Sequence, residues 1–139
     1  MSENPARTAS RRSVHIVETR PENAKQQWLE LFADDAIVED PVGRSPLDPQ
    51  GSGHRGKQEI GAFWDRTIAP VRVKFELRDS YACGDEVANV AKISTTLPDG
   101  SRFRTEGVFV YRVDAAGKIV SLRAFWEFDR MGASVEKSG

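Results

Sequence analysis

Apolar residues in the first half of the chain recur at helical spacing, and this spacing predicts three helices. The first covers about residues 12–19 and ends before Pro21. The second begins with Pro21 and Glu22, because proline suits the first helical position and a negative charge suits the first turn. Its apolar side consists of Trp28, Leu29, Leu31 and Phe32. The third covers about residues 57–69, with one apolar stripe made of Ile60, Phe63, Trp64 and Ile68.

After Pro70 the apolar period changes to two, which is the period of a half-buried β-strand. Long strands are predicted over about 71–78, 86–97 and 102–113, and a last one ends near Asp129. Tight turns between them favour an antiparallel meander, one face of which the helices must cover. We therefore predict a single α+β domain, a cone-shaped curved sheet, antiparallel or mixed, of about six strands wrapped around three helices, with a tapering cavity between the layers.

The ends of the chain have no apolar periodicity. We interpret residues 1–10 as a disordered leader, residues 11–130 as the domain and residues 131–139 as a flexible tail. The segment from Arg44 to Gly56 contains two prolines and several glycines, so we expect a loop beside the cavity mouth.

Composition excludes several classes of partner. The 139 residues include 20 Lys and Arg against 21 Asp and Glu, a formal net charge of −1, which does not favour nucleic acid. No apolar run approaches the ~18 residues that span a bilayer, so no membrane partner is expected. Cys83 is the only cysteine and the N-terminus lacks an apolar signal, which favours a cytoplasmic location. With only His15 and His54 available, no metal site is predicted, and His54 is interpreted as an exposed loop residue.

Asp40 is the main candidate for chemistry. It lies in the stretch LFADDAIVEDPVG, directly before Pro41, which disfavours a helix at Asp40. In a short strand, Ala36, Val38 and Asp40 point to one side. If Val38 faces the core, Asp40 faces the cavity, where apolar walls would raise its pKa and prepare it to move protons. The simpler interpretation is that Asp40 only caps a turn before proline.

Three stretches, LFADDAIVEDPVG, HRGKQEIGAFW and VYRVDAAGKIVSLRAFW, resemble the ketosteroid isomerase branch of the nuclear-transport-factor-two-like superfamily. The resemblance covers about residues 14–128 and implies a homodimer that needs no cofactor. It also implies that Asp40 takes a proton from carbon 4 of a delta-5-3-ketosteroid and returns it to carbon 6. In such isomerases a tyrosine and a protonated, neutral aspartic acid donate hydrogen bonds to the oxyanion of the intermediate.

The sequence departs from the family at these oxyanion positions. Counting along the motifs places Ile16 where the tyrosine is expected and Phe109 where the aspartate is expected. Supporting tyrosines fall at Phe32 and Trp64. Trp126, Tyr111 and His15 are candidate replacement donors. The substitutions enlarge the apolar wall, so we predict that a flat apolar ligand such as a steroid contacts Ile16, Phe32, Phe63, Trp64, Phe75, Phe109, Tyr111 and Trp126.

Three functional hypotheses follow. The first is a steroid delta-isomerase-like enzyme with Asp40 as acid and base. The second is a non-catalytic protein that binds a steroid or a similar apolar ligand, which the missing oxyanion donors favour. The third is other chemistry on this fold, such as polyketide cyclisation, or epoxide hydrolysis, which would need Arg104, Arg112 or Arg123 to point inward. Strand parity instead places these arginines on the outer sheet face beside Val108, Val110 and Phe125, a mixed surface that favours pairing with a second copy.

Overall fold

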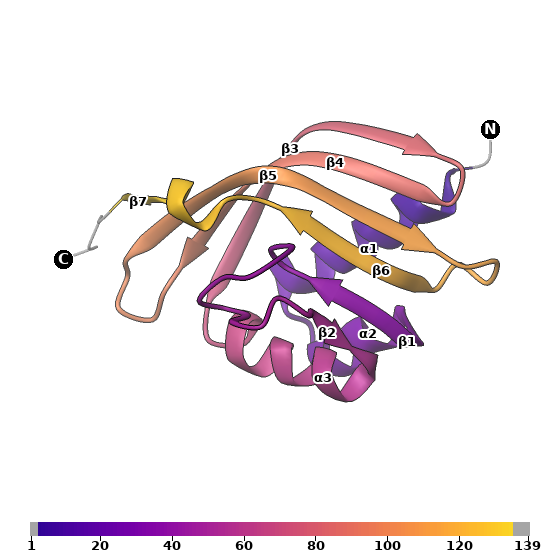
Figure 1. The fold of residues 1–139 in the computed structure, drawn as a ribbon, viewed down its shortest axis with the longest axis horizontal. Coiled ribbons are helices and arrows are strands. Elements are labelled where there is room, and N and C mark those ends of the chain that lie inside the picture. The colour runs from indigo at the N-terminus through magenta and orange to yellow at the C-terminus, as the bar shows by residue number, and fades with distance from the viewer. Residues whose placement is uncertain (1–2, 135–139) are drawn as a thin grey trace.

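The computed structural model describes residues 3–134. Within this range three α-helices lie on one side of a curved sheet (Figure 1). The helices are α1 (Pro5–Thr19), α2 (Ala24–Glu30) and α3 (Gly56–Phe63), which the π-helical segment η1 (Trp64–Ile68) continues. No helix in the described range is long and apolar enough to cross a membrane.

The sheet of the described residues is mixed and runs in the order β2-β1-β6-β5-β4-β3, and β7 also pairs with β5. Only the pairing of β1 with β6 is parallel among the described strands. The strands are β1 (Phe32–Glu39), β2 (His54–Arg55), β3 (Arg72–Cys83), β4 (Glu86–Thr96), β5 (Arg102–Val113), β6 (Ile119–Phe125) and β7 (Gly132–Ser134). A short 3-10 helix, η2 (Phe128–Arg130), separates the last two.

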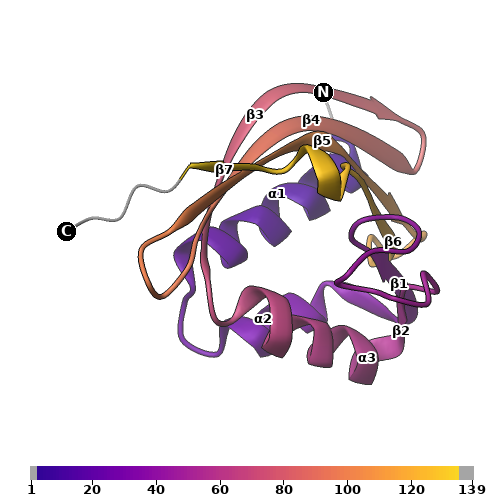
Figure 2. The same cartoon turned by 60° about the vertical axis from the view of Figure 1, so that its left-hand side comes forward.

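This architecture confirms the predicted α+β class and the cone. In Figure 2 the sheet arches over α1, while α2 and α3 close the opposite side. Helix α1 contacts β3, β4 and β5, and α3 contacts β1. The meander predicted from the two-residue period is formed by β3 to β6, which pair in sequence order. A cavity lies between the helices and the inner face of the sheet.

The helical layer is held together by a cluster of aromatic rings. The Trp28 ring lies 4.7 Å from the Phe32 ring and 5.2 Å from the Trp64 ring, centroid to centroid. All three side chains are almost completely buried. Burial of one such side chain contributes about 1.5–3 kcal/mol, so this cluster fixes α2, β1 and η1 against one another.

The N-terminal helix begins earlier than the sequence predicted. Residues 5–10 belong to α1, so the expected disordered leader is wrong for them. The Asn4 side chain accepts hydrogen bonds from the backbone N–H groups of Ala6 and Arg7, and Pro5 occupies the first turn. The buried face here consists of small residues such as Ala6 and Ala9, which carry little of the apolar signal used for prediction.

Two other boundaries are also corrected. Helix α2 begins at Ala24, because Arg20 and Asn23 adopt left-handed backbone conformations (φ 49° and 59°) that interrupt the helix around Pro21. Phe32 starts a strand, since it pairs with Ile119 of β6. At the other end, residues 132–134 pair with β5, so the flexible tail is wrong there. The remaining leader and tail residues, 1–2 and 135–139, lie outside the described residues.

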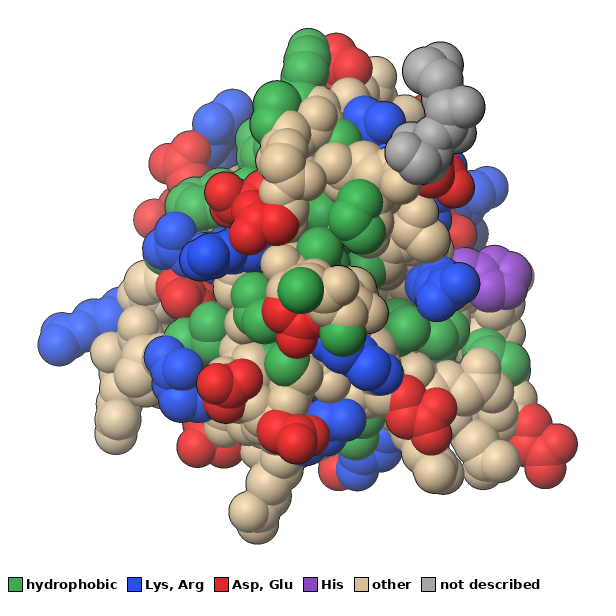
Figure 3. All heavy atoms as spheres, turned by 90° about the vertical axis from the view of Figure 1, so that its right-hand side faces the viewer, with side chains coloured by type: hydrophobic (Ala, Val, Ile, Leu, Met, Phe, Trp, Pro, Cys, Tyr) green, Lys and Arg blue, Asp and Glu red, His purple; other side chains and the backbone are tan. Residues whose placement is uncertain are grey.

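The face shown in Figure 3 carries charged side chains of both signs. Lys and Arg are interspersed with Asp and Glu, and apolar side chains lie between them. This face therefore presents no concentrated patch of one sign of charge, in keeping with the net charge of −1.

Candidate active site

Strand β1 delivers Asp40 to the end of the sheet next to β6. The strand buries Ala36 and Val38 on its inner side and leaves Ile37 and Glu39 half-buried, as the alternation predicts. Parallel pairing aligns Val38 with Leu122 and Glu39 with Arg123, so Asp40 follows directly beside the end of β6.

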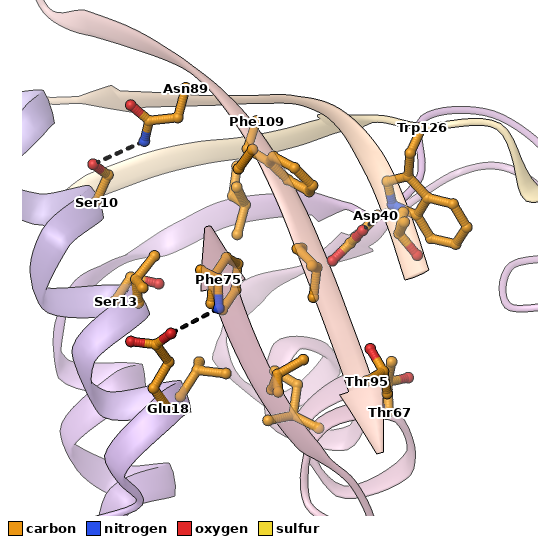
Figure 4. Close-up of a pocket in the computed structure, with 18 of the residues that line it drawn as sticks. Ser10, Ser13, Glu18, Asp40, Thr67, Phe75, Asn89, Thr95, Phe109 and Trp126 are labelled. Carbon is orange, nitrogen blue, oxygen red and sulfur yellow. Dashed lines mark hydrogen bonds between the residues drawn. The ribbon is translucent and has the colours of Figure 1, made fainter. Parts of the chain in front are cut away.

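The Asp40 carboxylate is held by one hydrogen bond. The indole Nε1–H of Trp126 donates to Asp40 Oδ1 over 2.6 Å. Figure 4 shows the two side chains side by side at one end of the cavity. Oδ2 accepts no hydrogen bond from a described residue. Every completely buried side-chain oxygen in the described range has a hydrogen-bond partner, so Oδ2 is not completely buried. Because Asp40 lines the cavity, a ligand there can approach its carboxylate.

A glycine on β5 allows Trp126 to reach this position. A Cβ atom on Gly107 would lie 2.3 Å from the Phe125 carbonyl oxygen and 2.9 Å from the Trp126 Cβ. The absence of a side chain there lets the chain after β6 cross close to β5. The indole then turns inward toward Asp40.

Apolar surroundings make Asp40 a stronger base than an exposed aspartate. Desolvation raises the pKa of the Asp40 carboxyl above its ordinary value of 3.8. The hydrogen bond from Trp126 and the electrostatic interaction with His54 lower the pKa, with smaller effects. A carboxylate with a raised pKa accepts a proton from carbon more readily, which is the property a proton-transfer base needs.

The cavity beside Asp40 has a volume of about 560 Å³, the size of a site for a small organic ligand. Its walls come from α1, η1 and the inner faces of β3, β4 and β5. Most lining side chains are apolar. Those from the helical layer include Val14, Val17, Phe63 and Ile68, and those from the sheet include Val73, Phe75, Ala91, Ile93, Phe103, Phe109 and Leu122.

The structure brings most of the predicted ligand contacts together. Phe63, Phe75, Phe109, Tyr111 and Trp126 line the same cavity as Asp40. Phe75 and Phe109 lie between Asp40 and α1 in Figure 4. The Trp126 N–H group is already bonded to Asp40, so it orients the base and is not a free donor for a ligand.

Three of the predicted ligand contacts lie away from the cavity wall. Ile16, Phe32 and Trp64 are buried in the core and do not line the cavity. Phe32 and Trp64 pack against Trp28 in the aromatic cluster. Counting residues back from Asp40 gives a position in the sequence but not the rotation of α1 about its axis. The cavity residues on α1 include Ser10, Ser13, Val14 and Val17, which follow i, i+3, i+4, i+7 spacing.

His54 is a neighbour of Asp40 that sequence reasoning missed. It was expected in an exposed loop, but it is buried in β2, opposite Val38, with its ring 4.9 Å from that of Phe63. It interacts electrostatically with Asp40. A strand of two residues, His54 and Arg55, within a Gly-rich segment gives no period that could have revealed it. The rest of the expected loop contributes Leu47 to the cavity wall.

The arginines required for epoxide hydrolysis do not point into the cavity. Arg104, Arg112 and Arg123 are exposed on the outer side of the sheet, as their strand parity predicts. Arg112 pairs with Asp85 and Arg123 with Glu39. Among the described lining residues Asp40 is the single aspartate, so an Asp-Arg-Asp arrangement is not assembled there.

A second polar group lies on the cavity wall near α1. The Trp28 Nε1–H donates to Ser13 Oγ over 2.9 Å, and the Tyr111 hydroxyl lies 3.0 Å from the same oxygen. Farther along α1, Asn89 Nδ2 donates to Ser10 Oγ over 3.1 Å (Figure 4). The cavity thus combines apolar walls with a few placed polar groups, the usual composition of a small-molecule site.

Comparison with known proteins identifies the family. Residues 12–122 match the model of the SnoaL-like domain, and the chain belongs to this family of the nuclear-transport-factor-two-like superfamily. Within the family it is 33% identical, over 96 residues, to a steroid delta-isomerase of Nocardioides simplex, a match that covers 69% of this chain and 71% of the relative.

Solved structures agree with this assignment. The delta-5-3-ketosteroid isomerase of a Mycobacterium species is 36% identical, with a TM-score of 0.88 over 95% of this chain and 100% of that chain. RV0760c of Mycobacterium tuberculosis is 34% identical, with a TM-score of 0.89 over 96% and 99% of the two chains. The same protein has been solved with estradiol-17beta-hemisuccinate. The epoxide hydrolase/cyclase-like enzyme SalBIII, 22% identical with a TM-score of 0.76, shares the fold.

Proposed function

We propose that this protein is a steroid delta-isomerase-like enzyme that moves a proton within a 3-ketosteroid or a similar apolar ketone. The observation that carries the proposal is the Asp40 carboxylate at the wall of a mostly apolar cavity, oriented by Trp126 through Oδ1 and without a hydrogen bond to a described residue at Oδ2. A base in this setting needs no cofactor to transfer a proton between two carbons of one ligand.

The proposed reaction has two steps that balance within the ligand. Asp40 Oδ2 first takes a proton from carbon 4, and the electrons of that C–H bond form a dienolate whose negative charge is on the carbonyl oxygen. Asp40 then returns the proton to carbon 6, which restores the ketone and shifts the double bond. Asp40 is ionised again after each cycle, so no external acid or base is consumed.

The relatives support this choice of chemistry. A steroid delta-isomerase and a delta-5-3-ketosteroid isomerase are among the proteins that the chain matches at 33% and 36% identity. The cavity volume of about 560 Å³ and its aromatic walls suit a flat apolar molecule of that class.

The test is the turnover of 5-androstene-3,17-dione by the native protein and by Asp40→Asn. We expect the substitution to abolish measurable isomerisation, because an amide cannot accept the proton. Asp34→Asn is the matched control, since Asp34 lies on the same strand but is fully exposed. Unchanged turnover in folded Asp40→Asn would refute the role of Asp40.

Steroid binding without catalysis is the second candidate function. It is favoured by the apolar side chains of Ile16 and Phe109 at the positions where the resemblance places oxyanion donors. In that case the native protein binds a steroid tightly, and native protein and Asp40→Asn show the same absence of turnover. A dienolate-like phenol such as equilenin, followed by fluorescence, measures this binding independently of the reaction.

We also propose that two copies pair through the outer face of the sheet. Register places a set of apolar residues next to one another on this face, and we name it the outer apolar stripe: Ala88, Val90, Val108, Val110 and Phe125. Phe125 is 43% exposed. Charges of both signs, such as Arg123 and Glu106, flank the stripe, which suits a two-fold pairing of identical surfaces.

A further inference from the structure

Three buried side chains from different elements meet on the cavity wall. Ser13 comes from α1, Trp28 from α2 and Tyr111 from β5, and all three line the cavity. Their exposed fractions are 2%, 1% and 5%. Both the Trp28 indole and the Tyr111 hydroxyl are hydrogen-bonded to the Ser13 oxygen. The proton transfer by Asp40 described above uses none of these groups.

The donors and acceptors of these three side chains leave one hydroxyl proton without an acceptor among them. An indole N–H can only donate, so Ser13 Oγ accepts from Trp28. The single contact between the Ser13 and Tyr111 oxygens uses one of their two hydroxyl protons. No other side-chain hydrogen bond of either hydroxyl occurs among the described residues. The second proton therefore has no acceptor among the described residues, and it belongs to a pair of hydroxyls that line the cavity.

The surroundings of Tyr111 keep its hydroxyl group protonated. Burial raises the pKa of Tyr111 to about 12, so the phenol stays protonated at neutral pH. The charge of Asp40 adds to this increase, which shows that the phenol lies within the electrostatic reach of the carboxylate. Asp40, Ser13 and Tyr111 line the same cavity, so a ligand there can contact both the base and the hydroxyl pair.

We propose that Ser13 and Tyr111 form a paired-hydroxyl donor that binds the carbonyl oxygen of the ligand while Asp40 transfers the proton. This proposal rests on the proposed function and deepens it, because it names the residues that bind the ketone oxygen. The donor replaces the missing groups at Ile16 and Phe109 with hydroxyls at other positions of α1 and β5. Trp28 is a positioning residue, since it fixes the Ser13 oxygen without contacting the ligand carbonyl.

The pair has a distinctive signature in a mutant cycle. Tyr111→Phe leaves the Ser13 proton available, and Ser13→Ala leaves the Tyr111 proton available. We expect each single variant to lose about tenfold in kcat, as for one neutral hydrogen bond. The double variant removes both protons and should lose about 10²–10³-fold, as when an oxyanion donor is deleted. Tyr81→Phe is the matched control, because Tyr81 is exposed and does not line the cavity.

A spectroscopic measurement separates ligand contact from a structural role. The infrared carbonyl stretch of a bound, ¹³C3-labelled 4-ene-3-ketosteroid moves to lower frequency when a donor binds the oxygen. We expect the stretch to move up in Tyr111→Phe and further in the double variant, with no change in Tyr81→Phe. Circular dichroism and thermal melting confirm that each variant is folded, and Tyr111→Phe keeps the ring that fills the core.

The outcomes distinguish the two proposals. If the steroid binds and the stretch is the same in native protein and folded Tyr111→Phe and double variants, the paired-hydroxyl donor is refuted and Asp40 catalysis is untouched. If the stretch shifts as expected but the native protein has no turnover, the donor stands and the isomerase function fails. If the labelled ketosteroid does not bind to the native protein, both proposals fail.

Discussion

Glu39 and Asp40 are adjacent residues with opposite environments. Glu39 points toward the outer side of the sheet, where its carboxylate lies 3.5 Å from Arg123. Asp40 points into the cavity, where an indole N–H is its hydrogen-bond donor and the walls are apolar. The same kind of side chain is a half-buried, ion-paired carboxylate on one face and a candidate base on the other. Strand alternation and exclusion of water, rather than residue type, produce this difference.

The largest effect on this contrast is expected from Gly107→Ala. The added Cβ would meet the Phe125 carbonyl oxygen at 2.3 Å, so the crossing of the chain over β5 must shift. We expect a loss of about 3 kcal/mol of unfolding free energy, within the range for severe overpacking, together with loss of isomerase activity. Denaturant unfolding measures the first effect.

Gly61→Ala is the control for this experiment, because its Cβ would meet only ordinary contacts, the nearest at 3.4 Å on the flexible Lys25 side chain. Equal stability of Gly107→Ala and native protein would mean that close crossing does not position Trp126.

The next largest effect is a change in the pH dependence of the unfolding free energy in Asp40→Asn. The folded-state pKa of Asp40 lies above its ordinary value of 3.8, so the native fold loses stability as pH rises through the folded-state pKa. Asparagine carries no charge to desolvate. We expect Asp40→Asn to be more stable than native protein at pH 7 by about 0.5–2 kcal/mol, the range of typical stabilising substitutions. The difference should shrink as the pH falls through the folded-state pKa toward 3.8, and it should stay small below that value. A constant difference across pH, in thermal melts, would contradict this account.

A smaller effect is expected from Trp126→Phe, which removes the N–H donor but keeps an aromatic ring. The hydrogen bond from Trp126 lowers the pKa of Asp40, so its loss should raise that pKa further. The acidic limb of the kcat/KM profile should therefore move to higher pH, with a loss of about tenfold in kcat/KM at neutral pH. An acidic limb at the native position would show that the indole does not tune the base.

The outer face offers the smallest effect on chemistry. Phe125→Glu places a charge in the outer apolar stripe, where Phe125 is 43% exposed. We expect the protein to become monomeric in sedimentation experiments, because two like charges would face each other across the two-fold axis. Its kcat should change by less than about threefold, since the side chain lies on the opposite face from Asp40. A native protein that is already monomeric would contradict the proposed pairing.

Much of the fold and part of the site could be predicted from the sequence. The two-residue period fixes which side of each strand faces inward, so the inward positions of Asp40, Phe109 and Tyr111 followed from parity. The rotation of α1 did not follow, because the helix buries small and polar residues such as Ser10 and Ser13 along with apolar ones. His54 was missed for a related reason, since its contacts with β1 and α3 are tertiary and leave no local pattern.

The contact between Ser13 and Tyr111 could not be predicted from the sequence either. Tyr111 was considered as a donor from its strand parity, but its partner lies 98 positions earlier in the chain. Only the packing of α1 against β5 brings the two hydroxyls together. Local sequence patterns report which face a residue occupies, whereas the identity of its hydrogen-bond partner depends on how the layers pack.

The most direct test of the account is a ¹³C NMR titration of the Asp40 carboxyl group, assigned by the disappearance of its signal in Asp40→Asn. We expect the pH midpoint of this titration to lie clearly above 3.8, because apolar walls oppose ionisation of the carboxyl group. A midpoint at or below 3.8 would mean that water reaches the carboxylate freely, and it would contradict the assignment of Asp40 as the cavity base.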